Sequence, residues 1–209
     1  MKIYDITRTI SATIATFPGD TPFSAERKAA LSNGDPVNLF TFHTTAHIGT
    51  HADAPYHYDD SGLHPDQLNL ERYIGLAHVV TVKRSSGAII PDDLAHVDLR
   101  GAKRLLLHTT ASESPSDQWN PNYPYPSVEL IDWIAEIGVV LIGVDGFSVD
   151  PPTSKTLDSH HRLNYHDIYI LETLCLTGVP DGTYELIALP LKIAGVCGTP
   201  VRAILRTLD

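Results

Sequence analysis

HIGTHADAPYH, residues 47–57, is the stretch that most strongly constrains the fold and chemistry of this chain. Its candidate metal ligands and proton carriers are His47, His51, Asp53 and His57. An even distribution would place about one of the chain's 11 histidines in the fifteen residues that end at His57, yet four occur there. We therefore expect the functional site to be built around this stretch.

The spacing of these residues restricts the local backbone. In a straight strand, at about 3.3 Å per residue, His47 and His51 would stand roughly 13 Å apart, whereas each ligand of one zinc ion lies about 2.0–2.1 Å from it. A helix is disfavoured by Gly49 and Pro55. We expect the chain to fold back at Gly49 and to bend again at Pro55. This predicts a metal-binding loop with His47, His51 and Asp53 as ligands.

A second group of candidate ligands occurs in SKTLDSHHRLNYHDIYILE, residues 154–172. Glu172 ends an expected strand in which Ile168 and Ile170 have the same parity, so burial of that face would bury the carboxylate as well. A buried carboxylate needs a cation, a hydrogen bond or a metal. Glu172 and one histidine would complete a second metal position, with Asp53 bridging the two ions through its two oxygens, as in two-metal hydrolytic sites. The alternative is a histidine-rich surface turn with Glu172 in a salt bridge.

The rest of the chain predicts an α/β fold with a mixed sheet, in one domain over residues 1–209. Strands are expected within residues 3–7, 37–45, 78–82, 104–110, 139–145, 167–172, 183–190 and 201–208. Loops are expected at residues 17–23, from 46 to about 65, and over the Pro-rich segment 112–127, which we interpret as an irregular surface excursion.

One helix is predicted with defined ends. Ser127 is the expected N-cap, and Leu130, Ile134 and Ile137 form an apolar face at helical spacing. Gly138 is expected to terminate the helix. Strands therefore outnumber helices.

Composition excludes several classes of protein. The chain has 15 Lys and Arg against 25 Asp and Glu, a net charge of −10, which disfavours nucleic acid and anionic membrane surfaces as partners. No apolar run approaches the about 20 residues of a membrane span, and we expect a cytoplasmic protein. Cys175 and Cys197 are expected to be buried thiols rather than a disulfide, metal ligands or a catalytic nucleophile. Motifs of serine hydrolases, nucleotide-binding loops and HExxH proteases are absent from the sequence.

The 47–57 stretch resembles the HxGTHxDxPxH signature of the cyclase family of metal-dependent amide hydrolases. The similarity runs nearly from end to end and includes FPGDTPF at 17–23, SKTLD at 154–158 and ELIALPLKIAGVCGTPVRAILR at 185–206. Within the family, the chain most resembles the branch that hydrolyses N-formyl-L-kynurenine to L-kynurenine and formate. The resemblance implies a swivelling β/β/α domain, which associates as a homodimer and acts on a small-molecule substrate.

The resemblance also implies a site of two zinc ions per subunit, with Asp53 bridging them. The implied ligands are His47, His51 and Asp53 for one ion, and Asp53, His160 and Glu172 for the other. His160 is assigned in preference to His161 by its place in the family's motif, which spacing alone does not decide. His57 matches the family's general acid/base.

Two positions depart from the family pattern. Phe17 occupies the position of a substrate-stacking tryptophan, and we expect it to stack on the substrate ring with less area and no N–H donor. Asp-Gly-Phe stands at 145–147, where Asp-Thr-Pro is more usual. These departures keep open an alternative substrate, another aryl or cyclic amide such as isatin. A non-enzymatic metal-binding protein is a further alternative, although structural zinc sites favour four protein ligands and cysteine.

Overall fold

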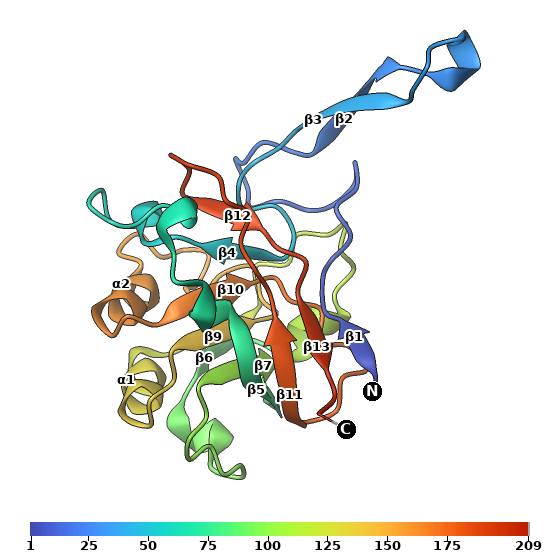
Figure 1. Cartoon of the computed structure of the whole chain (residues 1–209). Helices are drawn as coiled ribbons and strands as arrows, with labels where there is room; N and C mark the ends of the chain where they lie inside the picture. The colour runs from blue at the N-terminus through green and yellow to red at the C-terminus, as the bar shows by residue number, and fades with distance from the viewer. Residues whose placement is uncertain (209) are drawn as a thin grey trace.

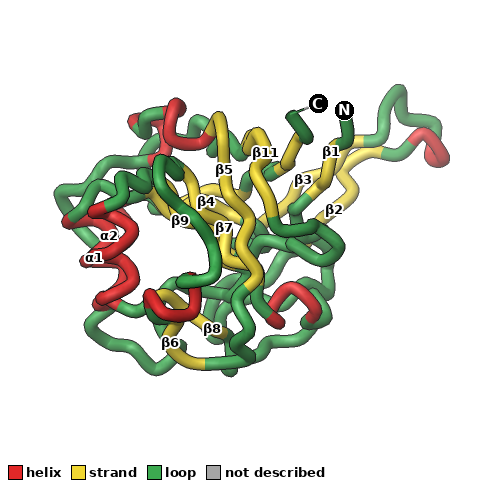
Figure 2. Tube along the Cα trace, turned by 90° about the horizontal axis from the view of Figure 1, so that it is seen from below, coloured by secondary structure: helices red, strands yellow, loops and turns green. Residues whose placement is uncertain are grey.

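A nine-stranded mixed sheet forms the centre of the computed structural model, which describes residues 1–208. In sheet order its strands are β1 (Ile3–Asp5), β13 (Ile204–Arg206), β11 (Gly182–Ile187), β5 (Ile74–Thr81), β7 (Arg104–His108), β9 (Leu141–Val144), β10 (Tyr169–Glu172), β4 (His51–Asp53) and β12 (Gly198–Pro200). The helices α1 (Val128–Glu136) and α2 (Asp158–Tyr165) lie side by side on one flank (Figures 1 and 2). The predicted α/β fold with a mixed sheet is confirmed.

The smaller elements lie outside this sheet. Two short sheets pair β2 (Ser24–Ala29) with β3 (Leu39–His43), and β6 (Gly87–Ile89) with β8 (Pro124–Pro126). The 3₁₀ helices are η1 (Leu31–Asn33), η2 (Pro55–His57), η3 (Pro65–Gln67), η4 (Leu70–Tyr73), η5 (Pro91–Leu94) and η6 (Thr110–Glu113). Within residues 1–208, no helix is both long and apolar enough to cross a membrane.

The core of the sheet follows the apolar runs of the sequence. Strand β9 runs parallel to β7 on one side and to β10 on the other, and all four of its residues are buried. A strand covered on both faces reads as a continuous apolar run, as predicted for 139–145. The helix α1 packs its buried side chains Leu130, Ile131 and Ile134 into the same apolar cluster as Ile142 of β9.

The predicted ends of α1 are confirmed. The Ser127 hydroxyl accepts the backbone N–H of Leu130 at 3.1 Å, as an N-cap should. The helix ends at Glu136, and Gly138 follows in the left-handed region at φ +89°.

The second helix, α2, was missed in the sequence. It buries Ser159, His160 and Leu163, so its inward face is mostly polar and carries little apolar periodicity. The preceding residue, Leu157, has φ +49°, a left-handed conformation that its residue type does not suggest. Strands β4 and β12 were also missed, because their sequences, His-Ala-Asp and Gly-Thr-Pro, contain no run of β-branched or aromatic residues.

The interpretation of 112–127 as an irregular surface excursion is wrong in part. The segment contributes β8, which pairs with β6, and it buries Tyr123, whose hydroxyl donates to the carbonyl of Asp150 at 3.0 Å. Ser112 is also buried, and its backbone N–H and hydroxyl both donate to the Asp145 carboxylate. The two ends of this proline-rich segment are therefore packed against the body of the protein, whereas residues 115–118 are exposed as expected.

The strand predicted within 37–45 forms, but outside the core. Strands β2 and β3 make an antiparallel hairpin that projects from the body of the protein (Figure 1). Every residue of β3 is exposed, including Phe40 and Phe42. We refer to residues 24–43 as the arm.

Candidate metal centre

The register of three strands creates the floor of the site. On β4, His51 and Asp53 point to one face because side chains alternate along a strand. The antiparallel partner β10 places Glu172 directly opposite His51. On the other side, β12 places Gly198 opposite Asp53. Two carboxylates and one imidazole therefore meet on a buried surface, where the charges need compensation.

Two glycines allow His47 to join this group. Gly49 has φ +58°, so the chain folds back between His47 and His51 as predicted. A Cβ atom on Gly198 would lie 2.8 Å from Cε1 of His47, so only glycine leaves room for that ring. His47 Nδ1 then lies 2.9 Å from Oδ1 of Asp53. The second predicted bend is also present, because Pro55 begins η2.

The helix α2 delivers His160 to the opposite side of Asp53. The carboxylate of Asp150 accepts the backbone N–H groups of Ser159 and His160 at 3.0 and 3.1 Å, and it contacts Nδ1 of His160 at 2.7 Å. This contact directs Nε2 of His160 toward Asp53 Oδ2, 3.3 Å away, and toward Glu172 Oε1, 3.6 Å away. His161 is exposed on the other face of the helix.

Asp53 occupies the centre of the cluster, and its two oxygens face different groups. Oδ1 lies 2.9 Å from Nδ1 of His47 and 3.4 Å from Nε2 of His51, whereas Oδ2 faces His160. Asp53 is 3% exposed. The structure thus brings together all five residues proposed as metal ligands, and it separates the contacts of Asp53 into two sets.

The buried nitrogen of His51 provides a test of whether these residues fit a metal. Its Nδ1–H donates to the Gly49 carbonyl at 2.8 Å, which directs Nε2, the atom that would bind a metal once it has lost its proton, into the site. That Nε2 atom is buried and has no hydrogen-bond partner. It faces Asp53 Oδ1 at 3.4 Å and Glu172 Oε2 at 3.3 Å, which are acceptors too. Acceptors converging on one point fit a cation, and the outward Nδ1–H bond is typical of a metal-binding histidine.

The acidic surroundings give the histidines an unusual affinity for protons. Burial alone lowers each pKa, but nearby acceptors outweigh it. Asp53 and Cys197 raise the pKa of His47 to about 11, and the carboxylates of Asp53 and Glu172, 3.4 and 3.3 Å from Nε2, raise that of His51 to about 9. Asp150 and Asp53 likewise raise the pKa of His160 to about 10.

Metal uptake should therefore release protons. Near pH 7.5 these histidines hold protons that an ion must displace, so affinity should rise with pH, most steeply up to about 9, where His51 loses its proton, and less steeply up to about 11. Acidification should weaken binding by about tenfold per unit for each proton displaced. Calorimetry of zinc binding in buffers of different ionisation enthalpy measures this release. His161→Gln, at the exposed neighbour of His160, should release the same number. Uptake without proton release would contradict the raised pKa values.

Asp150 was missed by the sequence, although it orients a proposed ligand. Replacing it with asparagine should weaken binding of the metal held through His160 by about 10- to 100-fold, because the support of the ring is lost. Asp158→Asn, at the exposed first residue of α2, is the matched control and should bind normally. Competition with a chelator of known affinity measures both variants. Equal affinities in the two would assign Asp150 to helix capping alone.

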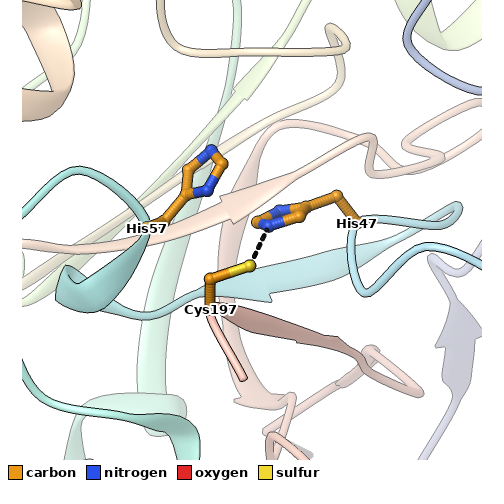
Figure 3. Close-up of side chains that lie close together, drawn as sticks. All are labelled: His47, His57 and Cys197. Atoms are coloured by element: carbon orange, nitrogen blue, oxygen red, sulfur yellow. Dashed lines mark hydrogen bonds between the residues drawn. The ribbon is translucent and has the colours of Figure 1, made fainter. Parts of the chain in front are cut away.

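The structure corrects the expectation for Cys197. Both cysteines are free thiols, as expected, but neither is fully buried: Cys175 and Cys197 are both half-buried. The Sγ atom of Cys197 lies 3.1 Å from Nε2 of His47 (Figure 3). The neighbouring His47 and His57 lower the pKa of this thiol to about 6, against the opposing effect of burial. The sequence gives no sign of this contact, because Cys197 lies 140 positions after His57 and carries no ligand motif of its own.

A cavity of about 310 Å³ opens above the cluster. Its polar floor includes His47, His51, His160 and Glu172, and His57 lines it as an exposed side chain. Phe17 and Phe147 also line the cavity. This combination of convergent polar groups and aromatic walls is typical of a small-molecule site.

Trp119 packs against both aromatic residues that line the cavity, Phe17 and Phe147. The Trp119 ring contacts Phe17 edge-on at 4.9 Å between centroids and Phe147 at 4.6 Å. Phe17 is 38% exposed, so one part of its surface remains accessible to a ligand. Asp145, by contrast, turns away from the cavity and holds Thr109 and Ser112.

Comparison with known proteins shows the family and the fold. The sequence model of the family described as "Putative cyclase" matches residues 4–151. Among solved structures, isatin hydrolase A from Labrenzia aggregata superimposes with a TM-score of 0.85 at 23% identity, covering 100% of this chain and 94% of that one. The chain belongs to the cyclase family, which confirms the resemblance.

Full-length relatives define its place in the family more closely. A protein of Maricaulis maris named kynurenine formamidase is 42% identical over 207 residues, which cover 99% of both chains. A kynurenine formamidase of Erythrobacter litoralis is 43% identical over 211 residues, covering 99% of this chain and 94% of its own length.

Proposed function

We propose that this chain is a zinc-dependent kynurenine formamidase, which hydrolyses N-formyl-L-kynurenine to L-kynurenine and formate. The observation that carries the proposal is the position of Asp53, whose two oxygens face two separate ligand sets beneath an aromatic-walled cavity. The full-length relatives named kynurenine formamidase support the choice of substrate.

The proposed metal site holds two zinc ions per subunit. His47, His51 and Asp53 would hold one ion, and Asp53, His160 and Glu172 the other. Bound there, the ions would acidify a water molecule and polarise the formyl oxygen. Glu172 is held in place by the backbone N–H of Val149, which donates to Oε1 at 2.8 Å.

His57 is the proposed general acid/base. It ends η2 at the rim of the cavity, with its ring 4.1 Å from that of His47 and 5.9 Å from that of His160. An imidazole can accept a proton at one ring nitrogen and donate one from the other. At this position it can deliver a proton to the departing aryl amine, which is otherwise a poor leaving group.

The aromatic side chains select the aryl part of the substrate in this proposal. Phe17 stacks on the kynurenine ring, and Trp119 fixes the orientation of Phe17 through the edge-on contact. The formyl group is small enough to reach the polar floor between the histidines. Isatin and related cyclic amides are the alternative substrates.

We further propose that residues 1–209 form one domain and that two copies associate as a homodimer in the cytoplasm. In support of the dimer, the arm exposes five large apolar side chains: Leu31, Val37, Leu39, Phe40 and Phe42. An isolated two-stranded hairpin is marginally stable in water, so packing of these side chains against a second copy would stabilise the arm. The free thiols Cys175 and Cys197 agree with a reducing compartment. Sedimentation of the purified protein at the mass of one chain would rule out the dimer.

Hydrolysis of N-formyl-L-kynurenine by the purified protein tests the function. The change in absorbance should be rapid, should stop after chelation and should return when zinc is added back. Isatin, assayed in parallel, should be hydrolysed far more slowly. Turnover that persists in the chelated protein would contradict the metal-dependent reaction, and faster turnover of isatin would assign the chain to the alternative substrate.

A further inference from the structure

We propose that His47, His57 and Cys197 form an additional cation site that is selective for thiophilic metal ions. An ion bound there inhibits the enzyme because it occupies His57. The inhibition rests on the proposed function of His57, whereas binding at this site does not. We call these three residues the thiol cluster.

The ligand atoms of the thiol cluster already lie close to the geometry of a metal site. His47 Nε2 and Cys197 Sγ are 3.1 Å apart, and one ligand atom from each of the three residues lies within 4.8 Å of the other two. Zinc–nitrogen and zinc–sulfur bonds of about 2.0 and 2.3 Å in a tetrahedron place the two ligand atoms roughly 3.5 Å apart. His47 and Cys197 are therefore already close enough for one ion, and the ring of His57 is the ligand that must move closer.

His57 is able to close this gap without movement of the fold. It is exposed, whereas His47 and Cys197 are only partly accessible, and Figure 3 shows its ring above the other two side chains. Rotation of an exposed side chain costs little compared with repacking of buried groups. His57 also lines the cavity, which gives an ion a route to the cluster.

The thiol cluster differs chemically from the proposed zinc pair. The pair offers imidazole and carboxylate ligands, whereas the cluster offers two imidazoles and a cysteine sulfur that binds as the thiolate, any proton still on it passing to solvent. Thiolate ligands select soft ions, and carboxylates suit harder ones. His47 is shared by the two sites, because its Nδ1 faces Asp53 and its Nε2 faces Cys197. With zinc on Nδ1 and the further ion on Nε2, the ring would bridge the two ions as an imidazolate, and its Nε2 proton would pass to solvent.

The backbone fixes Cys197 independently of its side chain. Its carbonyl accepts the N–H of Ala54 at 3.0 Å, and β12 begins at the next residue. The carbonyl of the preceding Val196 contacts Nδ1 of His64 at 3.0 Å. Replacement of the sulfur by oxygen should therefore leave the fold unchanged, so Cys197→Ser is a clean test.

The experiment titrates the zinc-loaded protein with cadmium ions. Three quantities are followed: cadmium and zinc bound per chain, the ultraviolet thiolate-to-cadmium charge-transfer band, and hydrolysis of N-formyl-L-kynurenine. Wild-type protein should take up one further equivalent of cadmium with retention of zinc, develop the band and lose activity. Cys197→Ser should lose the band and bind the further cadmium at least tenfold more weakly. Cys175→Ser, the other half-buried cysteine, should behave as wild type.

Three results would overturn the proposal. A band that persists in Cys197→Ser, or disappears in Cys175→Ser, would assign the sulfur ligand elsewhere. Cadmium that replaces zinc ion for ion with no band would show binding at the zinc pair alone. A saturated band with undiminished hydrolysis would exclude inhibition through His57. Because band and stoichiometry need no turnover, a protein inactive on N-formyl-L-kynurenine still tests the cation site, and that inactivity counts against the proposed function only.

Discussion

Asp53→Asn should remove both zinc ions and lower hydrolysis of N-formyl-L-kynurenine by about a thousandfold or more, since metal ions supply several kcal/mol of transition-state stabilisation. The carboxylate contacts His47 and His51 through one oxygen and His160 through the other. An amide has one oxygen and no negative charge, so it cannot serve both sets. Its NH₂ group would also face a histidine nitrogen that is needed as a ligand. Metal analysis after dialysis and the absorbance assay measure the two effects.

The matched control is Asp59→Asn, six residues further along the chain. The Asp59 carboxylate accepts hydrogen bonds from Ser61 and takes no part in the cluster. This variant should keep two zinc ions and full activity. The chelated wild-type protein is the reference for folding, and Asp53→Asn should unfold at a temperature close to it. If Asp53→Asn retains both ions, Asp53 does not bridge them.

The sequence was most informative where glycine and proline shape the backbone of the functional stretch itself. Gly49 and Pro55 predicted the reversal and the bend that bring His47, His51 and Asp53 together, because glycine and proline restrict the backbone directly. The apolar periodicity of α1 and the apolar run of β9 were equally clear, since burial of one face or of both leaves a regular pattern.

Contacts between distant segments were not accessible in the same way. Asp150 supports His160, and Cys197 contacts His47 across 150 positions, yet neither residue stands in a pattern of its own. The helix α2 was hidden for a related reason, because it turns a histidine and a serine inward where an amphipathic helix turns apolar residues. Because the site packs polar side chains against one another, the elements that carry them lack the apolar periodicity by which a buried helix is recognised.

His57→Gln should lower kcat by about 10²- to 10⁴-fold and leave two zinc ions bound, because general acid/base catalysis contributes within that range. His57 is exposed at the rim of the cavity, while the five proposed ligands converge beneath it. Glutamine preserves much of the size and polarity of histidine but cannot transfer a proton near neutral pH. Steady-state kinetics and metal analysis after dialysis measure the two effects.

Chemical rescue distinguishes a proton carrier from a residue that merely shapes the cavity. Imidazole added to a smaller variant, His57→Ala, should restore part of the lost rate, whereas the zinc content should not change. His161→Gln serves as the matched control, since His161 is an exposed histidine on α2 that lies outside the cavity lining. A loss of one zinc ion from His57→Gln would make His57 a ligand instead. If His57→Gln leaves the rate unchanged, another group at the rim of the cavity must carry the proton. A metal ion bound at the thiol cluster would then not inhibit through His57.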